Sequence, residues 1–139
     1  MSPMRKDLIS HHKVTSYELD SWGHVNNAVY LNYLEKARND YMTQKGLSFK
    51  KFSEWGVFPV LSKSIIEYKY PAFADDKLII YGYVQNYTAA SFTLKYNIVN
   101  DNDEKLIATA ETRHIIVNKK NRPSRIPDEF IEKFIKQQN

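Results

Sequence analysis

Four consecutive segments of alternating apolar and polar residues follow a single helix-like segment in this chain of 139 residues. The alternating segments span residues 57–70, 77–87, 91–99 and 104–118, and turn-forming residues bound them, most clearly the Asn and Asp run at 100–103. Short connections between successive strands favour antiparallel neighbours within one sheet. The chain is therefore expected to form an α+β domain.

The helix-like segment starts after Asn26 and Asn27, whose side chains favour the N-cap position, and Gly46 is a natural end. Its apolar residues recur at the spacing of one broad helical face. They are Tyr30, Leu34, Ala37 and Tyr41, widened by Leu31, Tyr33 and Met42. Small residues in the middle of the last alternating segment leave room for a bulky element. One sheet wrapped around one long central helix satisfies both patterns.

The remaining segments are compatible with a single domain. Residues 8–17 are expected to form a first strand, which brings the sheet to about five strands, and residues 49–55 a short helical turn. A C-terminal helix is expected over 127–137. No repeat, low-complexity tract or linker divides the chain. Residues 1–139 are therefore treated as one domain with its core over about 8–118.

The composition excludes several classes of protein. Without cysteine, the chain has no disulfide framework, no thiol nucleophile and no cysteine-based metal site. The N-terminal residues carry charges without an apolar run, which argues against a signal peptide. No segment approaches the ~20 apolar residues that a membrane-spanning helix needs. We expect a soluble cytoplasmic protein without a membrane partner.

The formal charge of +4 is concentrated in one segment, residues 113–125, which has five basic residues and no acidic one. These are Arg113, Lys119, Lys120, Arg122 and Arg125. The rest of the chain has 15 basic and 16 acidic residues, so its net charge is −1. Such a cluster can attract anions, although a solvated basic tail fits the pattern equally well. Nucleic acid is not an expected partner, because the helix carries Glu35 and Asp40 and the chain lacks a recognisable RNA-binding signature.

The residues best suited to chemistry lie just before the helix. Asp20, His24, Asn26 and Asn27 place a carboxylate, an imidazole and two amides within eight positions. Unpaired N–H groups and the positive end of the helix dipole favour an anion or a developing oxyanion at this place. Asp20 could act there as a nucleophile or general base toward a carbonyl group. The segment has the parts of an acyl-transfer site.

Purely structural roles fit the same residues. Asp20 and the two asparagines favour turns and helix caps, and Gly23 permits a positive φ. His24 alone is more often a structural histidine than a catalytic one. Glu35 and Arg38, three residues apart on the helix, can form an ordinary surface pair. Composition and spacing therefore leave the function open.

The segment from Asp20 to Glu35, with the pattern DxxGHVNNxxYLxYLE, closely resembles the signature of the hotdog-fold acyl thioesterases. The resemblance is greatest to the 4-hydroxybenzoyl-CoA thioesterase-like group and the plant acyl-ACP thioesterases. It continues through residues 66–78 and 121–127, and it covers roughly residues 12–128. It implies a hotdog domain, a sheet around a helix, which agrees with the order of elements derived above. It also implies hydrolysis of acyl-CoA or acyl-ACP to a free carboxylic acid.

The resemblance assigns roles to the residues before the helix. Asp20 matches the aspartate that attacks the thioester carbonyl or activates water, and the N–H of Asn27 matches the group that polarises the carbonyl oxygen. Gly23 matches the glycine of the tight turn. His24 matches a histidine with an orienting or a chemical part, and Asn26 matches a position that holds the loop beside the substrate. Asp20 is the residue expected first to carry the reaction.

Further site residues rest on weaker grounds. Glu35 matches a glutamate on the central helix that is the catalytic carboxylate in some members. Several apolar and polar residues could line the acyl channel, or they could equally be packing residues: Trp22, Tyr30, Tyr33, Phe58, Val60, Leu61 and Ser62. Thioesters are activated electrophiles, so a carboxylate and an oxyanion site suffice without a metal ion or cofactor.

The resemblance also concerns partners. It implies a homodimer, joined edge to edge with each site built from two chains, or a homotetramer. The cluster of Arg113, Lys119, Lys120 and Arg122 could meet the phosphates of coenzyme A or the acidic surface of acyl carrier protein. Two alternatives remain: a non-catalytic acyl-CoA binding or sensor protein, and a hotdog hydratase or dehydratase, which fits the DxxGHVNN core less well.

Overall fold

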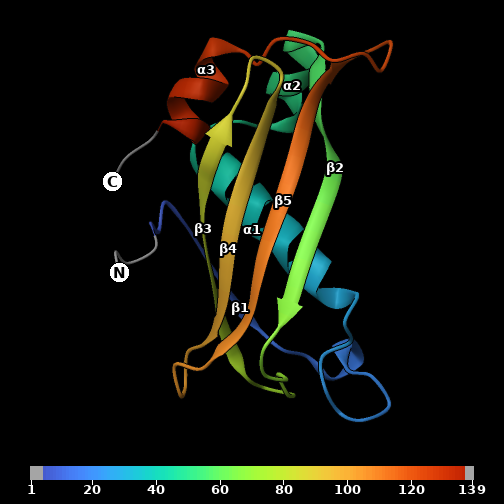
Figure 1. Ribbon diagram of the computed structural model, residues 1–139, viewed down its shortest axis with the longest axis vertical. Helices are drawn as coiled ribbons and strands as arrows, with labels where there is room; N and C mark the ends of the chain where they lie inside the picture. The colour runs from blue at the N-terminus through green and yellow to red at the C-terminus, as the bar shows by residue number, and fades with distance from the viewer. Residues whose placement is uncertain (1–4, 137–139) are drawn as a thin grey trace.

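The computed structural model describes residues 5–136 and contains one five-stranded sheet with a helix across one face (Figure 1). In spatial order the strands are β1 (Leu8–Lys13), β3 (Lys77–Tyr87), β4 (Ser91–Asn100), β5 (Leu106–Asn118) and β2 (Val57–Tyr68). Every neighbouring pair is antiparallel. The expected α+β class and five-stranded antiparallel sheet are confirmed.

Helix α1 (Val29–Gln44) packs chiefly against β1 and β3. Its buried residues have the expected spacing and are Tyr30, Tyr33, Leu34, Ala37 and Tyr41. Contrary to expectation, neither asparagine is the N-cap, which is Ala28. The side-chain Oδ1 of Asn26 instead accepts a hydrogen bond from the N–H of Ala28 at 2.9 Å. An Asx turn thus leads into α1, because the short amide side chain competes for the first backbone donors.

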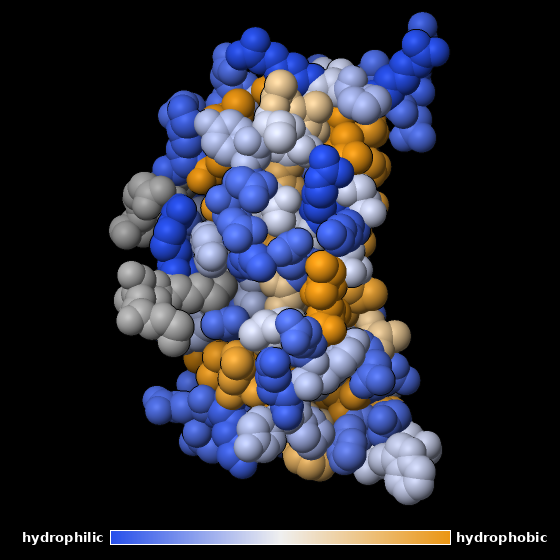
Figure 2. All heavy atoms as spheres, in the orientation of Figure 1, coloured by the Kyte–Doolittle hydropathy of each residue, from blue (hydrophilic) through white to orange (hydrophobic). Residues whose placement is uncertain are grey.

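The inner face of the sheet, turned toward α1, carries the small residues noted in the sequence. Ala108, Ala110 and Thr112 of β5 are buried, and the hydroxyl of Thr112 lies 2.6 Å from that of Tyr96 on β4. Arg38 of α1 donates a hydrogen bond to the same Tyr96 hydroxyl at 3.1 Å. The outer face is mostly hydrophilic, with scattered apolar patches (Figure 2).

The connection after β1 differs from the expected pattern, whereas the helix before β2 forms as expected. β1 ends at Lys13 rather than near residue 17, because the 3₁₀ turn η1 (Ser16–Glu18) follows it. Its start is a capping box, in which the Thr15 N–H donates to the Glu18 carboxylate at 2.9 Å. Helix α2 (Phe49–Trp55) forms where expected and ends at Gly56 in the left-handed conformation.

The C-terminal segment completes the core. A short helix α3 (Asp128–Phe130) continues as a π-helical turn η2 (Ile131–Ile135), so helical turns occupy residues 128–135 of the segment where a terminal helix was expected. Residue 137 of that expectation lies outside the described residues. Phe130 and Phe134 are buried with ring centroids 4.7 Å apart. Within residues 5–136, no helix has the length and apolar character to span a bilayer.

Strand β2 is an edge strand, and most of its residues are exposed. Five of its residues lie opposite buried inner-face residues of β5 and are therefore turned toward α1: Pro59, Leu61, Ser64, Ile66 and Tyr68. We call the strip between these residues and α1 the α1–β2 seam. The first residues of α1 lie near the end of β2 (Figure 1), so one end of the seam adjoins the segment before the helix.

Candidate active site

The segment between η1 and α1 closes into a tight loop. Asp20 and His24 close it by backbone bonding, because the Asp20 N–H donates to the His24 carbonyl at 2.7 Å. The Gly23 N–H donates to the Asp20 carbonyl at 3.1 Å, and Gly23 has a φ of +84°. Glycine adopts the left-handed backbone conformation without steric penalty, so Gly23 is suited to the tight turn that was predicted for it.

The Asp20 carboxylate is held by this loop and also has a free oxygen. Its Oδ1 accepts hydrogen bonds from the N–H groups of Trp22 at 2.9 Å and His24 at 3.1 Å. Its Oδ2 accepts none from the described residues. The loop therefore fixes the carboxylate by one oxygen and leaves the other available as a nucleophile or base.

The N–H of Asn27 is also free. Among its neighbours, Asn26 donates to the Glu18 carbonyl, Ala28 to the Asn26 side chain, and Val29 to the Asn26 carbonyl, each at 2.9 Å. The N–H of Asn27 has no such acceptor within the described chain. It lies directly before α1, where the helix dipole strengthens binding to a negatively polarised oxygen. This N–H is suited to polarise a carbonyl group.

Asp20 and Asn27 open into one hollow of about 200 Å³. Its wall is formed by residues of the loop, of α1 and of the segment at the end of β2: Asp20, His24, Val25, Asn27, Tyr30, Tyr68, Lys69, Tyr70 and Pro71. The structure thus brings together Asp20, His24, Asn27 and Tyr30, which are four of the predicted site residues. The distant segment 68–71 was not predicted to belong to the site.

Tyr68 connects this distant segment to the start of α1. Its hydroxyl donates a hydrogen bond to the backbone carbonyl of Asn27 at 3.1 Å, and its ring meets that of Tyr30 edge-on at 5.4 Å. The only sequence signal for it was the tyrosine of Glu67-Tyr68, inside the segment 66–78 that carries part of the family resemblance.

Two further side chains shape the polarity of the hollow. Burial raises the pKa of Tyr30 to about 12, and the charges of Tyr68 and Asp20 act in the same direction, so Tyr30 stays protonated. The His24 ring lies edge-on to Phe73 at 5.2 Å, and its two ring nitrogens make no hydrogen bond with the described residues. Its imidazole is therefore available to a ligand in the hollow.

Other predicted residues lie elsewhere. The Trp22 side chain is 82% exposed and does not line the hollow, and Asn26 holds the turn into α1. Val60 lies opposite Ile115, outside the inward-facing set of β2, and the Ser62 hydroxyl bonds the Arg113 carbonyl at 3.2 Å. The inward positions belong to Leu61, which was among the residues expected to line the channel, and to Pro59, which was not, because side chains alternate along a strand. Glu35 lines a second hollow farther along α1.

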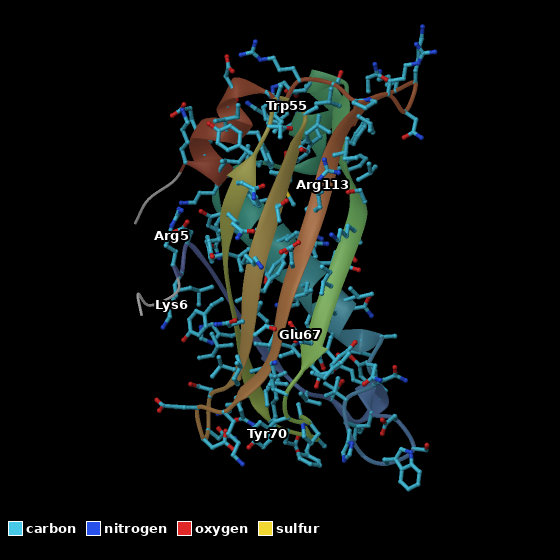
Figure 3. The ribbon with its side chains drawn as sticks, viewed as in Figure 1. Arg5, Lys6, Trp55, Glu67, Tyr70 and Arg113 are labelled. Atoms are coloured by element: carbon cyan, nitrogen blue, oxygen red, sulfur yellow. The ribbon has the colours of Figure 1, made fainter. Side chains whose placement is uncertain are left out.

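The basic cluster lies at the other end of the sheet. Tyr68 pairs with Ala108 and Val57 with Asn118, so the turn after Asn118 is about 30 Å from the Asp20 end at strand spacing. Figure 3 shows Arg113 on the upper part of β5 and Tyr70 at the lower end of the molecule. Within one chain, Lys119, Lys120 and Arg122 do not reach the hollow. No group of three His, Asp or Glu side chains within residues 5–136 is arranged to hold a metal ion.

Comparisons with known proteins point to one family. A model of the thioesterase-like superfamily matches residues 14–134. The long-chain acyl-CoA thioesterase FadM of Escherichia coli is 32% identical over 108 residues, 78% of this chain and 81% of FadM. The chloroplastic acyl-acyl carrier protein thioesterase ATL3 of Arabidopsis thaliana is 28% identical over 123 residues, 88% of this chain but only 65% of the plant protein.

A solved structure extends the similarity to three dimensions. The crystal structure of a hypothetical protein from Aquifex aeolicus superposes with a TM-score of 0.84 and 29% identity, and the match covers 91% of this chain and 98% of that one. The resemblance carried by Asp20–Glu35, and the hotdog fold that it implies, are confirmed.

Proposed function

Because the chain belongs to the thioesterase-like superfamily, we propose that it hydrolyses acyl thioesters, releasing a free carboxylic acid and the thiol of coenzyme A or acyl carrier protein. One observation carries the proposal. The free Oδ2 of Asp20 and the free N–H of Asn27 belong to residues that line the same hollow, so a carbonyl group there can meet both.

The proposed reaction can follow either of two routes. In the first, Oδ2 of Asp20 attacks the carbonyl carbon, the C–S bond breaks, the thiolate leaves, and water cleaves the resulting anhydride. In the second, Oδ2 takes a proton from a water molecule that attacks the same carbon, and this proton passes to the leaving thiolate. In both, the Asn27 N–H donates to the carbonyl oxygen as negative charge develops on it.

Asp20→Asn tests the proposal. The asparagine keeps an oxygen that can accept from Trp22 and His24, so the loop is preserved while the nucleophile or base is lost. Thiol release from a panel of acyl-CoA and acyl-ACP substrates should fall at least about 100-fold. Asp75→Asn is the matched control, because Asp75 is exposed and lies outside the hollow.

Two results would contradict the proposal. Full hydrolysis by Asp20→Asn would remove Asp20 from the chemistry. Binding of acyl-CoA by the wild type without any thiol release would indicate a binding protein instead of an enzyme.

We infer further that the protein works as a homodimer joined through β2. This edge strand has 12 residues and leaves Val60, Leu61 and Ile65 exposed, whereas the outer sheet face is largely hydrophilic (Figure 2). A long exposed edge with apolar side chains favours pairing with another strand. Two-fold symmetry makes the pair of identical β2 strands antiparallel.

Such pairing gives the basic cluster a place at the site. An antiparallel β2 pair lays the Val57 end of one chain beside the Tyr68 end of the other. The turn that carries Lys119, Lys120 and Arg122 would thereby approach the hollow of the partner, where it can bind the phosphates of coenzyme A or the acidic surface of acyl carrier protein. The cluster is proposed to act in trans.

A further inference from the structure

A second hollow lies farther along the α1–β2 seam and has a volume of about 150 Å³. Its walls come from α1, from β2 and from the core beneath them: Glu35, Arg38, Asn39, Met42, Pro59, Leu61, Phe92, His114 and Phe134. We call it the polar recess, because Arg38 and His114 place a guanidinium and an imidazole among otherwise mainly apolar walls. Neither group has a part in the hydrolysis proposed above.

The Arg38 guanidinium is half-buried and poorly satisfied by the protein. Its Nη1 donates to the Tyr96 hydroxyl at 3.1 Å, and no carboxylate of the described residues lies within 4.0 Å of it. Glu35 shares the recess but is exposed and makes no ion pair there. A guanidinium partly removed from water needs acceptors for its N–H groups, so most of its donors remain available to a ligand.

A chain of hydrogen bonds determines which ring nitrogen of His114 carries the proton. Arg38 can only donate, so the Tyr96 hydroxyl accepts from it, and among the described residues the one acceptor within reach of the Tyr96 proton is Thr112 Oγ1, 2.6 Å away. The Thr112 hydroxyl then donates to His114 Nε2 at 2.9 Å. Burial, reinforced by the charge of Arg38, lowers the pKa of His114 to about 3, so the ring is neutral and carries its proton on Nδ1. Arg38 and His114 are therefore both hydrogen-bond donors at this wall, to which Glu35 and Asn39 also belong.

The recess is in line with the candidate active site. Leu31, Glu35 and Arg38 follow one another at the spacing of one helical face, and Ile66 of β2 is turned toward the same seam. Asn27 lies just before the first turn of α1, and the helix rises about 14 Å from Val29 to Arg38. Helical side chains in general lean toward the start of their helix, which favours a shorter reach between the two sites.

From this arrangement we propose that the polar recess binds a hydrogen-bond-accepting oxygen on the far part of the acyl group, so that the enzyme prefers medium-length acyl thioesters that carry a distal carboxylate or hydroxyl. The proposal rests on the thioesterase function proposed above. The carbonyl of the thioester would lie at Asp20 and Asn27, the chain along Leu31 and Ile66, and the distal oxygen at Arg38.

Matched substrates test the proposal. Each set comprises coenzyme A thioesters of equal length, from six to twelve carbons, whose last carbon belongs to a methyl, hydroxymethyl or carboxylate group. The wild type should show a kcat/KM on the order of tenfold or more higher for an oxygenated member than for its methyl counterpart. Arg38→Met keeps the apolar stem and should reduce that ratio to about one.

Two controls keep the outcome interpretable. Lys36→Met removes a cation from another face of α1, where Lys36 pairs with Asp40 at 2.9 Å, and it should keep the wild-type ratio. If Arg38→Met does not fold, Arg38→Lys retains a cation and should keep part of the carboxylate preference but lose the hydroxyl preference. An equal ratio in the wild type and the Arg38 variant would overturn the proposal while hydrolysis itself persisted.

A second measurement separates the recess from catalysis. Titration calorimetry with the free acids needs no thiol release, and the wild type should bind the dicarboxylic acid more tightly than the monocarboxylic acid, unlike Arg38→Met. If no thioester is cleaved, the proposed function fails, but this measurement still tests whether the recess binds a distal oxygen. Equal binding of the two acids by the wild type would contradict the proposal for the recess.

Discussion

Asp20 uses one carboxylate oxygen to hold the loop and leaves the other free for the reaction proposed above. Oδ1 accepts from the N–H groups of Trp22 and His24 and holds the loop, while Oδ2 has no partner among residues 5–136. The sequence supported both a turn residue and a catalytic carboxylate, and the geometry shows that the two roles are compatible. A base held by one oxygen loses little freedom when the other one reacts, which favours catalysis.

Tyr68 is the unpredicted residue with the most direct contact to the catalytic backbone. Its hydrogen bond to the Asn27 carbonyl anchors the residue whose N–H is proposed to polarise the substrate. Tyr68→Phe removes this bond, which is worth about 0.5–1.5 kcal/mol, and should lower kcat about 2- to 10-fold with little change in KM. Steady-state thiol release gives both constants. Tyr87→Phe, at the far end of β3, is the control, and an unchanged kcat in Tyr68→Phe would exclude this role.

His114 makes stability depend on pH. Its pKa falls from an ordinary value of 6.5 to about 3 in the folded protein, because burial penalises the charged ring. The unfolded state therefore binds the proton first, and the stabilisation is complete above pH 6.5 and is lost as the pH falls from 6.5 toward 3. Relative to His114→Gln, the wild type should lose about 2 kcal/mol of unfolding free energy between pH 7.5 and 5.

Urea unfolding of both proteins at the two pH values measures this difference. Glutamine can still accept from the Thr112 hydroxyl, so the variant keeps the hydrogen bond and removes only the titration. Parallel loss of stability in the two proteins would show that the folded state protonates His114 as readily as the unfolded state, and that its pKa is not lowered.

At the level of helices and strands, the main errors of the sequence-based prediction occur at the ends of elements. The first strand stops at Lys13 because Thr15 and Glu18 form a capping box that starts η1, and α1 starts after an Asx turn at Asn26. In both places a polar side chain captures backbone donors that a continuing strand or helix would use. The apolar periodicity that located the elements contains no information about these local competitions.

Strand β2 shows how one residue of register changes a site. The prediction included Val60, Leu61 and Ser62 among the residues that could line the acyl channel. Of these three, Leu61 is turned inward, and it lines the polar recess with Pro59. Because strand side chains alternate between faces, consecutive residues of one strand do not all line one channel.

At the scale of the whole molecule, the basic cluster and the loop that bears Asp20 lie at opposite ends of the sheet. In one chain the cluster at Lys119, Lys120 and Arg122 lies at the end of β5 far from Asp20. An antiparallel β2 pair is the simplest symmetric arrangement that brings them together, and it also covers the exposed edge. The basic segment and the catalytic loop would then belong to different chains of one site.

Mixing two variants tests this arrangement. Lys119, Lys120 and Arg122 changed together to Gln should raise KM and weaken its dependence on salt, and Asp20→Asn should be inactive. In a mixed dimer, one site combines the intact Asp20 of the first chain with the intact cluster of the second. Activity with the wild-type KM should therefore return on mixing. A KM that stays at the value of the triple variant would show that the cluster acts within its own chain or not at all.

The order of the elements and the loop that bears Asp20, Gly23 and Asn27 could be derived from the sequence, because both depend on neighbouring residues. Apolar periodicity encodes a helix or strand locally, and the Asp20–Glu35 pattern keeps its catalytic groups within one loop and one helix start. The residues from distant parts of the chain that complete the hollow and the polar recess could be identified only from the tertiary structure. Tyr68 meets Asn27 across 41 positions and Arg38 meets Tyr96 across 58, through strand pairing and helix packing that no local pattern specifies.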